Sequence, residues 1–291
     1  MARPLRIEYP GAFYHITSRG NKRLPIFDND LDRKHFLNLL ANTCTTFNWR
    51  CHAYCLMNNH YHLLIETLEA NLAEGMRNLN GIYTQDFNYH HHTVGHLLQG
   101  RYKAFLIEAE TYLQEVVRYI VLNPVRAKLV NKPERWKWSN YAATSGLIAP
   151  PKFLTIDTTL RNFSKIITKA KKQYKDFVYD GIGQPSPFEE ASANRILGSP
   201  QFIDAIWNKV KISSQITEIP LTERLIGRPT LADIFDQNDS LQERNQGIFL
   251  ARQKCAYSIT QIASHLKLQR STVSAIFNNL LKSDNRRPDP V

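Results

Sequence analysis

The first 110 residues contain short stretches in which β-forming side chains dominate or alternate with polar ones. Residues 11–19 are rich in β-branched and aromatic residues and end at Gly20-Asn21, a turn signal, which predicts a strand. Three further stretches have the length and pattern of strands, namely residues 49–56, 60–66 and 103–108. The turn Met57-Asn58-Asn59 joins the first two of these stretches.

Apolar residues at helical spacing fill the intervals between these strands. Cap-forming residues at 28–32 precede one such run, and Asn71 begins a second run that continues to Phe87. A third helix is predicted from a cap at Thr111 to about Asn123, because the residue before Pro124 avoids helical geometry. The order β-α-β-β-α-β is that of the split-βαβ or ferredoxin-like fold, of the α+β class, in which the first and third strands are central.

Beyond this predicted domain, residues 1–146, the pattern becomes helical. An aromatic segment at 131–141 is expected to close the first domain. Residues 147–187 read as a linker and a lysine-rich helix, and 188–291 as a mostly helical region.

The C-terminal segment has the spacing of a helix-turn-helix at about residues 257–282. Ala263 is small where two helices would cross, while Lys267 occupies a turn position at which glycine is usual, at a cost of about 1 kcal/mol if that residue is left-handed. The second helix would present four side chains to a DNA groove, namely Arg270, Ser271, Thr272 and Ser274.

Composition narrows the class of partner. The chain has 291 residues, 43% of them hydrophobic, and a net charge of +11, which favours a polyanion such as nucleic acid. No apolar run approaches the roughly 20 residues of a membrane span, and no secretion signal is evident at the N-terminus, so a cytoplasmic protein is predicted. The cysteines form no C-x-x-C pair, and Cys51 and Cys55 are expected to pack as small apolar residues rather than to bind zinc.

Two histidines, His60 and His62, carry the first chemical signal. On a strand they point to the same face, and two imidazoles on one rigid strand make half of a divalent-metal site. An H-x-H pair by itself is a common accident, so the chain must also supply a third ligand. His15 is a spare candidate, although a packed strand histidine is the simpler interpretation. Basic residues near the strand ends are candidates to grip phosphates: Arg19, Lys22, Arg23, Arg101, Lys103 and, after the third helix, Arg126.

The third predicted helix supplies the rest of a site. Tyr119 and Asn123 are four residues apart and share a helix face. Two imidazoles and one amide oxygen suit Mg²⁺ or Mn²⁺, and a tyrosine hydroxyl can attack phosphorus and conserve the bond as a phosphotyrosine ester. Tyr112 is a rival nucleophile seven residues earlier, and Glu115 is a rival ligand in that register.

Three stretches of the chain resemble the REP-associated tyrosine transposases, which are single-tyrosine HUH transposases. They are His60-Tyr61-His62, His96-Leu-Leu-Gln-Gly-Arg-Tyr-Lys103 and Tyr119-Ile-Val-Leu-Asn-Pro-Val-Arg-Ala127, and the likeness covers roughly residues 5–145. Tyr61 departs from the aliphatic residue usual between the two histidines.

This resemblance implies a metal-dependent endonuclease and strand transferase that acts on single-stranded DNA hairpins through a 5′-phosphotyrosine intermediate. It assigns Tyr119, rather than Tyr112, as the nucleophile and implies His60, His62 and Asn123 as metal ligands. Duplex DNA is a further predicted partner through the helix-turn-helix. The alternatives are a non-catalytic regulator that binds hairpin or duplex DNA, and a metal phosphodiesterase that uses water. The sequence determines neither the target DNA nor the oligomeric state.

Overall fold

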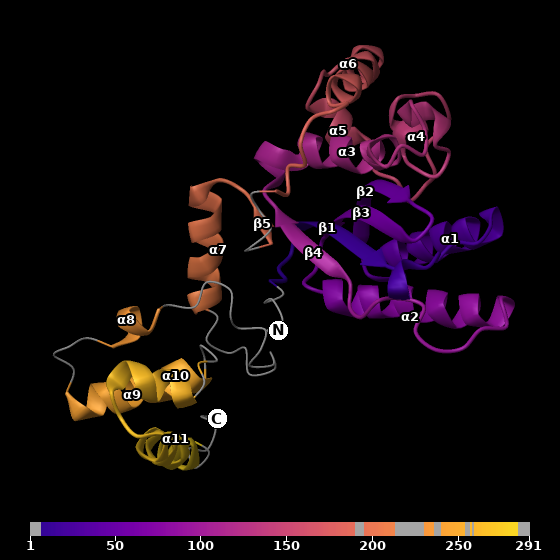
Figure 1. The fold of residues 1–291 in the computed structure, drawn as a ribbon. Helices are drawn as coiled ribbons and strands as arrows, with labels where there is room; N and C mark the ends of the chain where they lie inside the picture. Colours follow the sequence, from indigo (N-terminus) through magenta and orange to yellow (C-terminus); the bar gives the residue numbers. More distant parts are fainter. Residues whose placement is uncertain are drawn as a thin grey trace. The chain divides into compact units, whose positions relative to one another are not determined.

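One sheet of mixed strand direction organises the larger of two compact units, residues 7–206. The computed structural model describes residues 7–189, 195–212, 230–235, 240–253, 257 and 259–284. In the sheet, β1 (Ala12–Arg19) lies antiparallel between β3 (His60–Thr67) and β4 (Lys103–Ile107). The outer neighbours are β2 (Trp49–Leu56), antiparallel to β3, and β5 (Ile196–Leu197), parallel to β4. The order β2-β3-β1-β4-β5 confirms the ferredoxin-like prediction for four strands and adds an unpredicted fifth (Figure 1).

Helices cover both faces of this sheet. On one face lie α1 (Asp30–Thr46), which begins at an Asn29 capping box, and α2 (Leu72–His90). Tyr61 of β3 points to this face, where its ring packs on Phe36 and its hydroxyl donates to Oδ1 of Asn80 at 2.6 Å. That bond satisfies the polar tip of Tyr61, so the departure from an aliphatic residue leaves no unpaired hydroxyl in the core.

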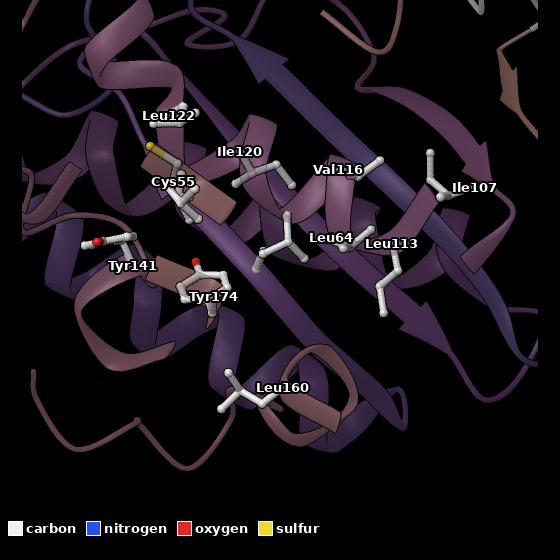
Figure 2. Packing of buried hydrophobic residues seen from close by; sticks show 14 of the residues in the cluster. Cys55, Leu64, Ile107, Leu113, Val116, Ile120, Leu122, Tyr141, Leu160 and Tyr174 are labelled. Carbon is white, nitrogen blue, oxygen red and sulfur yellow. The ribbon is translucent and has the colours of Figure 1, made fainter. Parts of the chain in front are cut away.

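The opposite face packs against α3 (Ala109–Arg126). Leu64 of β3 meets Val116 and Ile120 of α3 in this core (Figure 2). Residues 147–187 do not serve as a linker, because α5 (Asp157–Arg161) and the lysine-rich α6 (Ile167–Asp180) bury apolar side chains in the same core, including Leu160, Ala170, Tyr174 and Val178. The predicted domain limits at 146 and 187 therefore fall inside the unit.

The end of α3 differs from the sequence-based prediction. The helix continues through Pro124 to Arg126 instead of ending at Asn123. Proline lacks the N–H that would bond to the carbonyl of Ile120. The side-chain Nδ2 of Asn123 donates to that carbonyl at 3.4 Å and to the carbonyl of Tyr119 at 2.9 Å, which replaces the missing donor.

The aromatic segment predicted to close the first domain lies along the outer edge of β2. Leu56 donates its N–H to the carbonyl of Trp138 at 2.8 Å, and the indole of Trp136 donates to the carbonyl of Leu56 at 3.1 Å. The 3₁₀ turn η2 (Pro133–Arg135) precedes this edge contact, and α4 (Tyr141–Thr144) follows it. The segment thus covers backbone groups that an exposed edge strand would leave unpaired.

The smaller unit contains α8 (Leu231–Ile234), α9 (Leu241–Gln253), α10 (Ile259–Leu266) and α11 (Arg270–Asp284). Ile262, Ala263 and Val273 join α10 to α11 in its core, and Lys267 in the turn has φ +54°, the left-handed conformation considered above. Helix α7 (Pro200–Ile212) follows β5. None of the helices within the described ranges has the length and apolar character to cross a membrane.

Two glycines of α2 provide a matched test of the packing on the α1–α2 face. A Cβ at Gly75 would overlap the indole ring of Trp49, whereas one at Gly81 would meet no heavy atom of the described residues within 4 Å. We expect Gly75→Ala to lower the free energy of unfolding by about 1–3 kcal/mol through overpacking. Gly81→Ala should raise it by up to about 1 kcal/mol, because alanine favours a helix. Urea unfolding measures both values, and equal stability of the two variants would contradict the packing.

Candidate active site

His60 and His62 lie on the face of β3 that α3 covers. In the antiparallel pairing with β1, His60 is opposite Arg19 and His62 is opposite Thr17. The two imidazole centroids are 5.0 Å apart, with the rings at 73°. Strand alternation thus places both rings together, as the sequence predicts.

The ring of His60 is held by its neighbour Asn59. Nδ1 of His60 lies 2.7 Å from Oδ1 of Asn59, and Nδ2 of Asn59 donates to the carbonyl of Arg23 at 2.9 Å. Because the amide nitrogen is committed to the Arg23 carbonyl, the atom facing His60 is an acceptor. His60 therefore carries its proton on Nδ1 and has a lone pair on Nε2, the atom available to a ligand.

The ring of His62 meets His15 of β1. Nε2 of His15 lies 2.9 Å from Nδ1 of His62, and the two rings are nearly coplanar, with their centroids 5.2 Å apart and their planes at 3°. The Nε2 atom of His62 is buried and has no hydrogen-bond partner among the described residues. A buried unpartnered nitrogen at this position fits a metal ligand, because metal binding would satisfy it.

Burial keeps these imidazoles neutral. It lowers the pKa of His15 to about 3, and together with the charge of Arg19 it lowers the pKa of His60 to about 4. The pKa of His62 lies well below its ordinary value, first through burial and then through the neighbouring His15, His60 and Arg19. Neutral imidazole is the form that binds a metal ion, so the ligands need no deprotonation at neutral pH.

Tyr119 of α3 reaches this histidine group. Its ring stands edge-on to His15 at 5.8 Å and to His62 at 5.9 Å, and the guanidinium of Arg126 lies 5.4 Å from its centroid. Tyr112 is seven residues earlier, about 10 Å along the helix axis at 1.5 Å per residue. Of these two tyrosines, Tyr119 makes ring contacts to His15 and His62, and no such contact of Tyr112 occurs among the described residues.

Asn123 lies one turn beyond Tyr119, with its Nδ2 turned back to the helix carbonyls. In this orientation the side-chain oxygen Oδ1 points away from the helix carbonyls, and it is the atom of Asn123 that would bind a metal ion. In the described part of the chain no three His, Cys, Asp or Glu side chains are grouped to hold a metal ion. Two imidazoles with an amide oxygen nonetheless fit the nitrogen and oxygen preferences of Mn²⁺ and, less strongly, of Mg²⁺. The rival ligand Glu115 is paired with Arg118 instead.

Comparison with known families found a similarity within the larger unit. Residues 9–123 match the family model described as "Transposase IS200 like". This part of the chain, less than half of its length, is similar to the IS200-like transposases. The matched segment ends at Asn123, so it contains the histidine pair and Tyr119 but not the C-terminal unit.

A structure search also found a likeness to a solved protein entitled "Structure of the REP associates tyrosine transposase bound to a REP hairpin". The TM-score is 0.44 and the identity 16%, over 53% of this chain and 92% of that one. A search of curated proteins gave no significant match to the chain.

Phe188 is a residue of the candidate site that the sequence does not predict. It follows α6, in Gly-Gln-Pro-Ser-Pro-Phe, and its ring stacks on His15 at 4.5 Å and packs on Tyr119 at 5.2 Å. Arg126 ties the same segment down by donating to the carbonyl of Gln184 at 2.5 Å. A lone aromatic after a proline-rich break has no periodicity, so the sequence contains no signal for this contact.

The backbone of the larger unit brings the predicted basic residues of two loops together. A bridge pairs Gly20 with Leu98, and the N–H of Gln99 donates to the carbonyl of Arg19 at 2.8 Å. Lys103 of β4 is paired with Thr17 of β1, and Thr17 is paired with His62 of β3. Lys103 therefore lies two strands away from His62 in the same row of the sheet. The side chains that these pairings gather are exposed, namely Arg19, Lys22, Arg23, Arg101 and Lys103. In the other unit, Arg270, Ser271 and Thr272 are exposed and Ser274 is half-buried, all in the first turns of α11.

Proposed function

We propose that the larger unit, residues 7–206, is a metal-dependent endonuclease and strand transferase that acts on single-stranded DNA hairpins through a 5′-phosphotyrosine intermediate. One observation carries the proposal: the ring of Tyr119 lies edge-on to His62, whose buried Nε2 has no partner among the described residues, within a segment that matches the IS200-like transposase model. The preference for hairpins rests on the sequence resemblance to the REP-associated tyrosine transposases.

His60, His62 and Asn123 would hold Mg²⁺ or Mn²⁺, the two histidines through Nε2 and the asparagine through Oδ1. When bound, such an ion supplies Lewis-acid polarisation of a phosphate oxygen. Neutral histidines keep the site ready at physiological pH, because their lowered pKa values remove competition from protons.

In the proposed step the hydroxyl oxygen of Tyr119 forms a bond to phosphorus, and the bond from phosphorus to the 3′ oxygen breaks. The phenol proton is released, the 3′ oxygen takes up a proton, and the 5′ phosphate remains on the protein. Arg126, whose guanidinium lies beside the ring of Tyr119, would stabilise the developing negative charge. The exposed basic residues of the two joined loops would hold the flanking phosphates.

The test is incubation of the full chain with end-labelled hairpin oligonucleotides and Mn²⁺, followed by denaturing electrophoresis. We expect the label on the 5′-phosphate side of the cut to migrate with the protein, and a free 3′ hydroxyl on the other fragment. Cleavage without an adduct would favour the phosphodiesterase that uses water. Hairpin binding without cleavage would favour a DNA-binding regulator.

For the smaller unit we infer that α10 and α11 form a helix-turn-helix that binds duplex DNA. The exposed first turn of α11 supports this function, because a recognition helix contacts base edges through its N-terminal residues.

Replacing Arg270 and Ser271 with alanine together should weaken duplex binding by about 10-fold or more, since two polar contacts are lost. Cleavage of single-stranded hairpins should be unchanged. A gel-shift titration at fixed salt measures the affinity, and Asn279→Ala, an exposed change further along α11, is the control. Equal duplex affinity of all three proteins would assign the unit a packing or assembly role instead.

A further inference from the structure

Each histidine of the pair on β3 has a polar atom facing its Nδ1. For His60 that atom is Oδ1 of Asn59 at 2.7 Å, and for His62 it is Nε2 of His15 at 2.9 Å. The Asn59 oxygen can only accept, so it fixes the proton of His60 on Nδ1. If His15 also accepts, both histidines of the pair present a lone pair on Nε2.

The contact between His15 and His62 allows two proton arrangements. In one, Nδ1 of His62 donates and the lone pair of His62 is on Nε2, while His15 carries its proton on Nδ1. In the other, Nε2 of His15 donates and the proton of His62 is on Nε2. The outer atoms in question, Nδ1 of His15 and Nε2 of His62, are both buried without partners among the described residues, so each arrangement leaves one donor and one acceptor unsatisfied. Only the first arrangement allows His62 to bind a cation.

Packing holds His15 in the position that this contact needs. Its ring meets His62 edge to edge, Phe188 stacks on its face at 25°, and Phe105 and Tyr119 contact it as well. Four surrounding rings leave His15 little freedom to rotate away. A residue so enclosed contributes a fixed nitrogen rather than a mobile one.

We propose that His15 is a positioning residue for His62: its Nε2 accepts the Nδ1 proton of His62, which orients the His62 ring and places the lone pair on Nε2. Metal-bound histidines commonly donate their second N–H to a fixed acceptor, usually a carboxylate or carbonyl. Here the acceptor is the neutral imidazole of His15, on the adjacent strand β1. This role rests on the proposed function, because a bound divalent cation is what makes use of the lone pair.

The proton arrangement is measurable in the unmutated full chain. Imidazole ¹⁵N NMR spectra recorded during a Mg²⁺ titration should show His62 protonated on Nδ1 and unprotonated on Nε2 at saturation, with His15 protonated on Nδ1. A saturated protein in which His62 keeps its proton on Nε2 would overturn the role of His15 alone. Absence of Mn²⁺ binding by the same protein, followed by electron paramagnetic resonance, would overturn the metal site and this role together.

Two substitutions separate the acceptor from the ring. His15→Phe keeps an aromatic ring stacked on Phe188 but has no acceptor, and we expect it to weaken Mn²⁺ binding by about 10- to 100-fold. His15→Gln restores an amide acceptor and should stay within about 10-fold of the unmutated protein. Equal affinity of these two variants would show that the acceptor is irrelevant. His52→Gln is the control, since His52 is also fully buried but bonds to Glu66 elsewhere in the sheet, and it should leave Mn²⁺ affinity unchanged.

Discussion

Tyr119→Phe is expected to abolish the covalent protein–DNA adduct while hairpin binding and Mn²⁺ binding stay close to those of the unmutated protein. The substitution removes one oxygen and keeps the ring that packs on His15, His62 and Phe188, so the core should stay intact. Loss of a catalytic nucleophile reduces rates by about 10⁴-fold or more. Denaturing electrophoresis of the labelled hairpin measures the adduct, and a gel shift measures the affinity.

Tyr112→Phe is the matched control. It removes the same oxygen from the same helix, about two turns away, and should keep most of the cleavage activity. An adduct formed by Tyr119→Phe but not by Tyr112→Phe would make Tyr112 the nucleophile. Unchanged cleavage by both variants would favour attack by water.

His60→Ala and His62→Ala should each reduce cleavage by at least about 100-fold, because each removes one of the two proposed imidazole ligands. Much of the DNA affinity should remain, since phosphate contacts come from the exposed arginines and lysines. Cleavage assays with and without EDTA, together with a filter-binding titration, check both statements. His92→Ala, an exposed histidine just beyond α2, should cleave normally. Full activity of the unmutated protein in EDTA would contradict metal dependence.

Asn123→Ala should have a smaller effect on cleavage, because water can replace one neutral oxygen ligand. The structure adds a second consequence. The same side chain supplies the donor that Pro124 removes from α3, so its loss should also lower the free energy of unfolding by about 1 kcal/mol. A urea titration separates this loss from the effect on catalysis.

Local periodicity in the sequence predicts which residues of the candidate site share a face of one strand or helix. Alternation along β3 places His60 and His62 on one face, and the four-residue spacing in α3 places Tyr119 and Asn123 together. Both relations depend only on the geometry of a single strand or helix. They can therefore be derived from the sequence once the element is assigned.

Pro124 shows where such local reasoning fails. The preference against helix before proline predicts an end at Asn123, yet the helix continues because burial of Val121, Leu122 and Pro124 stabilises it and Asn123 caps the freed carbonyl. The histidines after α2 show the same limit. The run His90-His91-His92, in a polar stretch before Gly95, by composition alone predicts a solvated loop tip. In the structure His90 ends α2, and His91 bonds to Asp32 at 2.9 Å while packing on Phe87.

The sequence by itself therefore determined the strand and helix order, the histidine pair and the helix that carries Tyr119, because these follow from spacings within one element. Only the tertiary structure decided the partners of that pair. His15 reaches His62 through the register between β1 and β3, and Phe188 reaches His15 from beyond α6. Contacts between residues so far apart in the chain are set by packing of the whole core, for which no local spacing carries a signal.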